Sequence, residues 1–258
     1  MKKRLDMVLV ERGLAESRTR AQALVMEGKV RVSGGVELKS SRMVGDGDEV
    51  AVEAPPRFVS RGGEKLEGAF GKFGEESAIN PPLCVDNLVC LDVGSSTGGF
   101  TDCLLQHGAA FVMAVDVGTN QLAYKLRSDP RVWVRENFNA RYMTPADLPR
   151  TPHVAVTDVS FISLKLILPP IVDVLEPGGL IVALIKPQFE VGKGNAPGGL
   201  VRDESLRLAA RDSIVEFAVK DLGLELLGLA ESPIRGKEMG NIEYLSYWRK
   251  TYDRKVDS

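Results

Sequence analysis

The chain is organised around an apolar run that ends in a loop of small residues. Residues 89–93 read Val-Cys-Leu-Asp-Val, residues 94–99 read Gly-Ser-Ser-Thr-Gly-Gly, and a mixed apolar stretch begins at Phe100. This order predicts a buried strand, a tight glycine turn and the start of a helix. Gly94 can adopt backbone angles closed to other residues, and Gly98 and Gly99 would let a ligand approach the main chain.

A second predicted strand, which ends in an acid, indicates what the loop binds. Residues 110–115 are apolar and end at Asp116, roughly 20 residues beyond the loop, where an acid commonly binds the ribose of a nucleoside. The helix between the two strands would direct free amide groups toward the loop. Together these features predict a cofactor that contains a nucleoside.

Further apolar runs predict strands at 132–134, 153–157 and 180–185 and a late strand at 243–248. Helices are expected at 164–175, interrupted by Pro169 and Pro170, and at 204–222. Strands that alternate with helices predict an α/β fold with a Rossmann-like, doubly wound sheet. Such a sheet binds its ligand at the carboxyl ends of its strands.

Residues 1–54 predict a separate, small α+β domain. One short helix ends near Gly13, a second follows the N-cap Ser17, and short strands follow near 30–32 and 49–52. Pro55 and Pro56 introduce a stiff linker over residues 55–60, and the doubly wound domain spans 61–258. Basic residues could form one face of the small domain, but acids nearly balance them, so charge alone decides nothing.

Composition excludes several classes of site. The formal charge of −2 gives no bulk attraction to a polyanion. The three cysteines have no metal-ligand spacing and only two histidines are present, so we expect neither a metal site nor a histidine-based triad. The amino-terminal stretch lacks the apolar run of a secretory signal, and no run approaches a membrane span, so we expect a cytoplasmic protein.

Four charged residues fall where the sheet would present its active edge. Asp158 and Lys186 end predicted strands, Glu243 begins the last one, and Lys65 precedes the first. Each could be a surface salt bridge, but six apolar residues lead directly into Lys186. Two lysines in one partly desolvated cleft favour a neutral amine, which can accept a proton from a hydroxyl group.

The first unit resembles the S4-type RNA-binding module. The resemblance rests on Arg-Leu-Asp at 4–6, Ser-Arg-Thr-Arg-Ala-Gln at 17–22, Gly-Lys-Val-Arg-Val at 28–32 and Asp-Gly-Asp at 46–48. It implies that the module binds structured RNA through its second helix and the loop after it. The residues that it implies for RNA contact are Arg4, Arg18, Arg20, Lys29 and Arg31.

Nearly the whole chain resembles the TlyA family, which is similar to the FtsJ-type RNA 2′-O-methyltransferases. Five motifs occur in order, at 60–66, 92–102, 157–161, 186–190 and 240–244. The resemblance implies methylation of a ribose 2′-hydroxyl in ribosomal RNA, of cytidine, with S-adenosylmethionine as cofactor and ribosomal subunits as partners. It places a Lys-Asp-Lys-Glu tetrad on Lys65, Asp158, Lys186 and Glu243, with Glu238 as a competing fourth acid. The cofactor residues that it implies are Asp92, Gly94, Ser96, Gly98, Gly99, Phe100, Asp116 and Asn139.

Three alternatives remain open at this point. Residues 158–161, Asp-Val-Ser-Phe, loosely match the motif of amino-methyltransferases, which would indicate methylation of a base nitrogen. The TlyA family was also named for hemolysis, but a membrane-active protein would need a long amphipathic or apolar segment. A non-catalytic RNA-binding protein could keep the cofactor fold for packing alone. The target nucleotide and the oligomeric state are not predicted.

Overall fold

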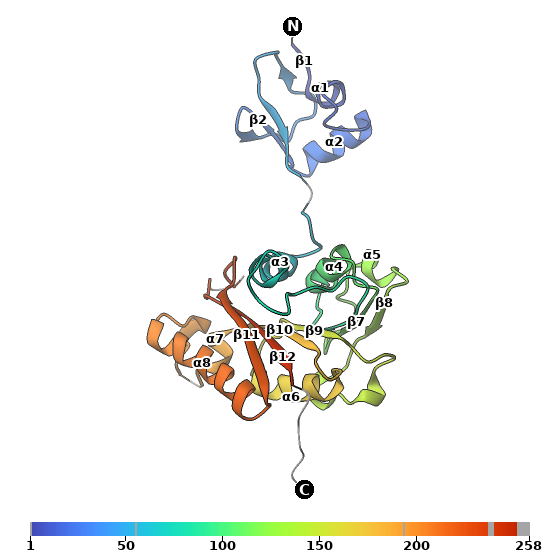
Figure 1. The fold of residues 1–258 in the computed structure, drawn as a ribbon. Coiled ribbons are helices and arrows are strands. Elements are labelled where there is room, and N and C mark those ends of the chain that lie inside the picture. Colours follow the sequence, from blue (N-terminus) through green and yellow to red (C-terminus); the bar gives the residue numbers. More distant parts are fainter. Residues whose placement is uncertain (1, 55, 193, 237–239, 252–258) are drawn as a thin grey trace. The chain divides into compact units, whose positions relative to one another are not determined.

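In the computed structural model of the protein, residues 2–54, 56–192, 194–236 and 240–251 are described (Figure 1). The chain divides into two compact units, residues 1–56 and 57–258. We expected a linker over 55–60, but Phe58 is buried in the core of the second unit. The Val59 amide also donates to Asp102 at 2.8 Å. The chain therefore packs on the second unit from about residue 57 onward.

Over its described residues, 2–54 and 56, the first unit contains two helices and five short strands. The helices are α1 (Leu5–Glu11) and α2 (Arg18–Met26), and the Ser17 hydroxyl accepts the Arg20 amide as the N-cap of α2. Strands β1 (Lys3–Arg4) and β4 (Met43–Val44) pair with each other, and β2 (Val30–Val32) pairs with both β3 (Gly35–Val36) and β5 (Val50–Val52). The predicted α+β architecture is confirmed.

The second unit is built on a seven-stranded sheet in the order β11-β12-β10-β9-β6-β7-β8. Its parallel part consists of β6 (Val89–Val93), β7 (Phe111–Val115), β8 (Val132–Arg135), β9 (Val154–Thr157) and β10 (Leu180–Ile185). The strand β12 (Tyr244–Lys250) runs antiparallel between β10 and β11 (Leu224–Glu231). The predicted α/β class is confirmed.

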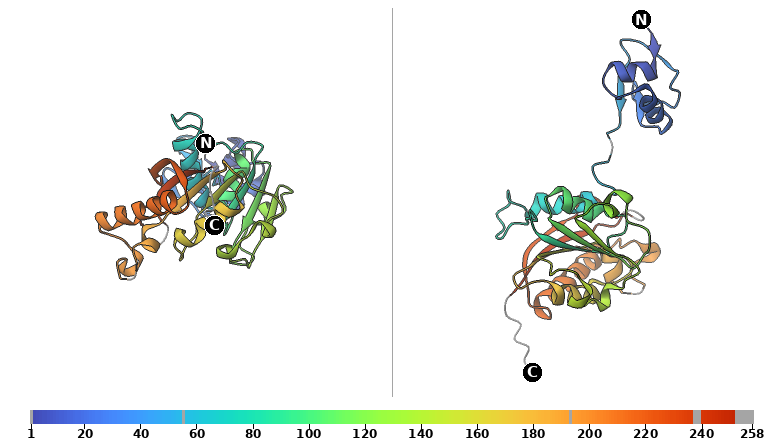
Figure 2. Two further views of the ribbon diagram at one scale, coloured as in Figure 1. Left: turned by 60° about the horizontal axis from the view of Figure 1, so that its bottom comes forward. Right: turned by 90° about the vertical axis from the view of Figure 1, so that its right-hand side faces the viewer.

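Helices cover both faces of this sheet, as Figures 1 and 2 show. One apolar cluster joins α3 (Gly62–Phe73), α4 (Gly99–Gln106) and α5 (Tyr124–Arg127) to strand residues such as Cys90, Val156 and Leu184. The other joins α6 (Leu164–Val174) and α8 (Glu204–Lys220) to the alternate residues, such as Leu91 and Ala155. Alternate strand residues point to opposite faces, so a sheet covered on both sides has apolar residues at nearly every strand position.

Shorter helical segments complete the second unit: α7 (Pro187–Glu190), η1 (Ala140–Tyr142), η2 (Pro145–Asp147) and η3 (Pro197–Gly199). One prediction was wrong. We expected α6 to be interrupted at Pro169 and Pro170, but it runs through both, because its buried face packs continuously on the sheet. The strand β11 was not among the predicted strands, since it lies at the sheet edge and mixes acids with apolar residues.

Candidate active site

A cavity of about 890 Å³ opens at the carboxyl ends of the central parallel strands. It lies beside β6 and β9, where the strand order reverses, because β6 continues to β7 on one side and pairs with β9 on the other. Doubly wound sheets bind their ligands at such a point. The residues that line the cavity come from the glycine loop, α3, the ends of β9 and β10, and two later loops: Val59–Gly62, Lys65, Gly94–Thr97, Gly99, Phe100, Asp158, Ser160, Phe161, Lys186, Gln188, Phe189, Ala196, Gly198, Gly199, Arg235, Gly236, Asn241 and Glu243.

The structure brings the four predicted tetrad residues together at one side of this cavity. Lys186 Nζ lies 2.6 Å from Asp158 Oδ1, and Lys65 Nζ lies 2.7 Å from Glu243 Oε2 and 3.4 Å from Asp158 Oδ2. Lys65, Lys186 and Glu243 are all less than one tenth exposed. Glu238, the competing acid, lies outside the described residues.

Strand register explains why residues so distant in sequence meet. Thr157 pairs with Ala183 in the parallel ladder, so Asp158 and Lys186 leave neighbouring strands at the same edge. Tyr244 pairs with Ile185 in the antiparallel ladder, which brings Glu243 back to that edge. The helix α3 supplies Lys65 from one face of the sheet.

The tetrad differs from our expectation in one respect. We expected the two lysines to lie side by side, but the carboxylate of Asp158 contacts both of them. Two cations and two anions cancel, which compensates for the cost of burying them. Lys186 Nζ also donates to the Ser160 hydroxyl at 2.8 Å, a contact that sequence reasoning did not predict.

The glycine loop is held by Asp116, which follows β7. One carboxylate oxygen accepts the Ser96 amide at 2.7 Å and the other accepts the Gly118 amide at 2.7 Å. Gly94 and Gly98 both have left-handed backbone angles, with φ of 83° and 95°. The loop therefore presents the main chain of residues 94–97 to the cavity, and Asp116 fixes its shape.

Gly98 does not have the role that we expected. A side chain at Gly98 should have met the cofactor, but a Cβ atom there would lie 2.3 Å from Leu126 Cδ1 and 2.8 Å from Leu122 Cδ1. It would point into the apolar core beneath α4 and away from the cavity. Gly99 faces another direction, because its Cβ would lie 2.7 Å from the Gly63 amide nitrogen. The two glycines allow close packing of the loop, α3 and α5.

The remaining predicted cofactor residues occupy different places. Phe100 lines the cavity and is buried. Asn139 is exposed and its side chain accepts the Arg141 amide, so it caps η1. Asp92 is fully buried in β6 beneath the loop, where the Thr101 hydroxyl donates to Oδ2 at 2.6 Å and Oδ1 has no hydrogen-bond partner among the described residues.

Asp92 gives a pH-dependent prediction. Burial raises the pKa of this carboxyl group to about 7, although the Thr101 hydrogen bond opposes the change. The pKa of an aspartate in an unfolded chain is about 3.9, so between about pH 4 and 7 the folded protein binds a proton that the unfolded chain does not. The free energy of unfolding therefore falls as the pH rises through that window. Asp92→Asn cannot ionise, so its Tm relative to wild type should rise through the window and level off above it. Thermal unfolding of both proteins from pH 4 to 8 measures this, and a constant difference in Tm would contradict it.

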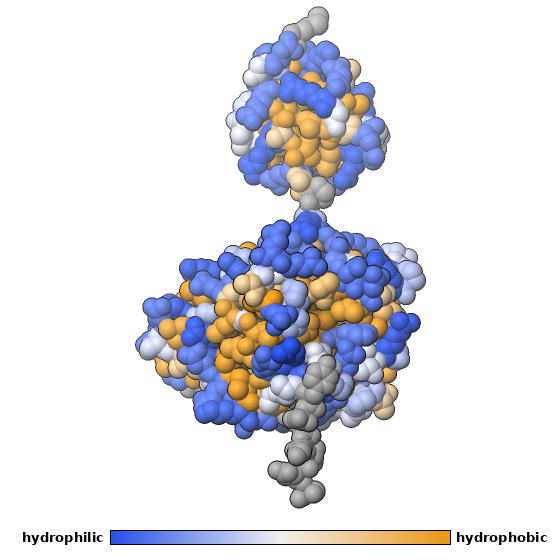
Figure 3. All heavy atoms as spheres, viewed as in Figure 1, coloured by the Kyte–Doolittle hydropathy of each residue, from blue (hydrophilic) through white to orange (hydrophobic). Residues whose placement is uncertain are grey.

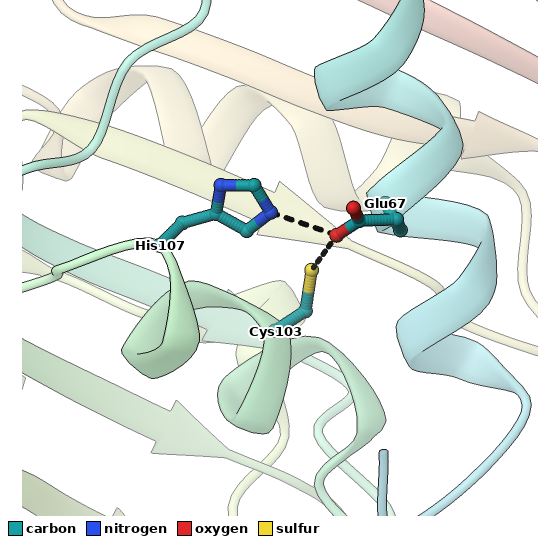
Figure 4. Close-up of side chains that lie close together, drawn as sticks. All are labelled: Glu67, Cys103 and His107. Atoms are coloured by element: carbon teal, nitrogen blue, oxygen red, sulfur yellow. Dashed lines mark hydrogen bonds and ion pairs between the residues drawn. The ribbon is translucent and has the colours of Figure 1, made fainter. Parts of the chain in front are cut away.

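A second cluster of titratable groups joins α3 to α4 and is not part of the cavity lining (Figure 4). Glu67, Cys103 and His107 each place one possible metal-ligating atom within 4.8 Å of the others, a grouping that the sequence did not predict. His107 Nε2 lies 2.7 Å from Glu67 Oε2, and Arg57 Nη1 lies 2.6 Å from Glu67 Oε1. Burial raises the pKa of the Cys103 thiol, which favours the protonated form over the thiolate that a metal needs. The cluster is organised around Glu67, whose carboxylate contacts Arg57, Cys103 and His107 and so links α3 to α4.

The mouth of the cavity carries an aromatic surface, which includes the phenylalanine that ends the 158–161 motif. Phe161 is 82% exposed and has a φ of 63°, which is rare for a bulky residue. Its ring lies 5.2 Å from that of Phe189, measured between centroids. An exposed phenylalanine in a strained conformation beside a cavity indicates a functional surface for stacking. The sequence signalled this residue only as the aromatic end of the 158–161 motif, three positions after Asp158, and not as an exposed surface.

The predicted RNA-contact residues lie on the first unit, and each contacts an acid. Arg4 and Arg18 both bond to the fully buried Asp6, and Arg4 above all holds the pKa of that carboxyl below its usual value. The exposed pairs are Arg20 and Lys29 with Glu27, and Arg31 with Glu53. Figure 3 also shows an apolar area on one face of this unit. Arg4 and Arg18 thus support the fold, whereas Arg20, Lys29 and Arg31 are held only by exposed pairs.

Comparison with protein-family models decides the family. The model described as "FtsJ-like methyltransferase" matches residues 58–250, and the S4 domain model matches residues 3–50. The chain belongs to the FtsJ-like methyltransferase family. The FtsJ-like match covers all four tetrad residues and the glycine loop, and the S4 match covers the five predicted RNA-contact residues.

Relatives of this FtsJ-like chain align along nearly its whole length. The Mycobacterium tuberculosis protein named 16S/23S rRNA (cytidine-2'-O)-methyltransferase TlyA is 43% identical, over 99% of this chain and 92% of the relative. The protein named Hemolysin A of Brachyspira hyodysenteriae is 43% identical, over 95% and 99%. A solved structure from Streptococcus thermophilus, described as a candidate hemolysin, has a TM-score of 0.72 at 44% identity, over 97% of this chain and 89% of that one. Within the described ranges, no helix of the FtsJ-like chain is both long and apolar enough to cross a bilayer.

Proposed function

We propose that the protein transfers a methyl group from S-adenosylmethionine to the 2′-hydroxyl of a cytidine ribose in ribosomal RNA. The observation that carries this proposal is the pair of lysines held by two acids beside the glycine loop. Family membership and the names of the relatives support the same reaction. Methylation of a base nitrogen would need no lysine pair, so the tetrad favours the ribose hydroxyl.

The residues at the loop fit the cofactor. Residues 94–97 line the cavity. Asp116 accepts one amide at each carboxylate oxygen, so each oxygen keeps a lone pair for a ribose hydroxyl. Bound S-adenosylmethionine supplies a methyl group made electrophilic by its sulfonium charge. The loop holds the nucleoside, and the tetrad meets the hydroxyl that is to be methylated.

The tetrad then performs two tasks. Asp158 contacts both lysines and so fixes the position of each Nζ atom at the cavity wall. Lys186 passes its own proton to Asp158, whose Oδ1 lies 2.6 Å from Nζ, and the neutral amine then orients the 2′-hydroxyl and accepts its proton. Lys65 and Glu243 balance each other's charge beside it. The exposed ring of Phe161 offers a surface on which the nucleobase can stack outside the tetrad.

Mapping of ribosomal RNA tests the reaction. Purified small and large ribosomal subunits are incubated with the protein and labelled S-adenosylmethionine, and the RNA is then digested with alkali. A 2′-O-methyl group blocks cleavage at its own phosphate, so the label should remain in an alkali-resistant dinucleotide. Label recovered in mononucleotides would indicate base methylation and would overturn the proposal. Because ribosomal subunits are the proposed substrate, we also propose that the protein is cytoplasmic.

The first unit, residues 1–54, is proposed to dock this RNA through Arg20, Lys29 and Arg31 with Arg4 and Arg18. Phosphate binding releases counterions, so Lys29→Ala/Arg31→Ala should weaken RNA binding. The salt slope, which is the magnitude of the slope of log K for RNA binding against log salt concentration, should fall by about 0.7–0.9 for each phosphate that is no longer neutralised. Neither side chain holds the buried Asp6, so the fold should survive. Binding of ribosomal RNA is titrated at several salt concentrations. Arg249→Ala, which removes an exposed pair with Glu225 in the other unit, is the matched control. An unchanged slope in the double variant would contradict the assignment.

A further inference from the structure

The charges that line the cavity do not cancel. Its described lining contains six charged residues, and four of them are the mutually paired tetrad. The other two are Arg61 and Arg235, which both carry positive charge. No ion pair with an acid is found for either guanidinium among the described residues, and both residues are exposed. The described wall of the cavity therefore has an excess of two positive charges, placed outside the tetrad.

These two arginines flank the tetrad closely. Arg61 is the N-cap residue of α3, one helical turn before Lys65. Arg61 Nη2 donates to the backbone carbonyl of Arg235 at 3.1 Å, which ties the two segments together. A Cβ atom on Gly236, the next residue, would lie 2.8 Å from Glu243 Oε1, so this segment passes directly over the tetrad acid.

We propose that Arg61 and Arg235 form a subsite for the phosphate group on the 3′ side of the methylated ribose. The inference rests on the proposed function. The 2′-oxygen and the 3′-phosphodiester are carried by adjacent ribose carbons, so a hydroxyl held at Lys186 brings that phosphate to the cavity rim. The tetrad is neutral and cannot attract it. A guanidinium has five donors in a planar fork that matches phosphate oxygens, and the Arg61 side chain uses one of them on the Arg235 carbonyl.

The same oxyanion chemistry has a second possible source, the carboxylate of S-adenosylmethionine. The two sources differ in what they predict. A phosphate subsite changes RNA binding and its salt dependence and leaves the affinity for S-adenosylmethionine unchanged. A carboxylate subsite weakens the affinity for S-adenosylmethionine and leaves the salt slope of RNA binding at its wild-type value.

The test uses the full chain with Arg61→Ala/Arg235→Ala and, as a matched control, Arg150→Ala. Arg150 is exposed and precedes β9, at the opposite edge of the sheet from the cavity. RNA binding without cofactor is titrated at several salt concentrations, and S-adenosylmethionine binding is measured by calorimetry. We expect the salt slope of the double variant to be smaller than that of wild type by about 0.7–0.9, the value for one phosphate. Its affinity for S-adenosylmethionine should not change. Its kcat/KM for RNA should fall about 10-fold to 100-fold, the range for removing one charge-assisted hydrogen bond.

The single variant Arg61→Lys separates charge from geometry. Lysine keeps the charge but lacks the fork, so the salt slope should stay at its wild-type value while kcat/KM falls. An unchanged slope in the double variant, or a reduction confined to S-adenosylmethionine affinity, would overturn the phosphate assignment. RNA binding is measured without catalysis, so the subsite can be judged even if the methylation product is not the one proposed.

Discussion

Replacing Lys186 by alanine is expected to lower the rate of methyl transfer by about 10² or more, the range for removing a positioned general base. Lys186 Nζ contacts Asp158 Oδ1 at 2.6 Å and the Ser160 hydroxyl at 2.8 Å, so it is held at one place on the cavity wall. The glycine loop is untouched by this change. The affinity for S-adenosylmethionine, measured by calorimetry, should therefore remain near that of wild type, while single-turnover methylation of ribosomal RNA slows.

Lys186→Arg is the matched variant, because it keeps the positive charge beside Asp158. A guanidinium does not give up its proton, so this variant should fail almost as badly as alanine if Lys186 accepts the proton. Ser160→Ala removes only the second contact of Nζ and should cost less. Methylation by Lys186→Arg at a rate near wild type would mean that Lys186 only provides charge, and that the proton leaves by another group such as Asp158.

Replacing Glu243 by alanine is expected to have the largest effect on stability. Glu243 is 2% exposed and lies 2.7 Å from Lys65 Nζ, so its removal leaves a buried cation with only Asp158, at 3.4 Å. Removal of one partner of a buried ion pair lowers the free energy of unfolding by about 3–5 kcal/mol, which corresponds to a fall in Tm of roughly 10 °C for a unit of this size. Methyl transfer should fall as well, because Lys65 loses its position. Thermal unfolding and single-turnover methylation measure the two effects.

Two further variants isolate the cause. Glu243→Gln keeps the shape and a hydrogen-bond acceptor but removes the charge, so it should be destabilised nearly as much as alanine. Glu243→Ala combined with Lys65→Met removes both charges and should recover much of the stability, because a buried pair is worth little more than apolar residues of similar volume. A double variant no more stable than Glu243→Ala would show that packing at this position, and not charge pairing, holds the structure.

Much of the site follows from local sequence because parallel strands align their carboxyl ends. Once residues 153–157 and 180–185 are recognised as buried strands, Asp158 and Lys186 must leave the same edge of the sheet. Glu243 lies at the same edge because β12 pairs antiparallel with β10, and no local sequence pattern specifies that pairing. The sequence also does not reveal which neighbours a side chain at each glycine would meet. A Cβ atom on Gly98 would meet Leu126 because α5 packs against the loop, and that packing is a property of the tertiary structure. Phe161 was named as part of a motif, but its exposure and its positive φ were not predicted, because neither property leaves a mark in the local sequence.

The insertion of β12 between β10 and β11 has a consequence during synthesis of the chain. The cofactor loop, α3, Asp158 and Lys186 are all translated before β11 and β12, and Glu243 reaches Lys65 only when the final hairpin inserts into the sheet. A growing polypeptide on its own ribosome could thus form the nucleoside pocket while still lacking the fourth member of its catalytic group. The tetrad can be complete only after β12 has left the exit tunnel and paired with β10. The last strand to be made therefore finishes a site whose other parts are encoded earlier in the chain.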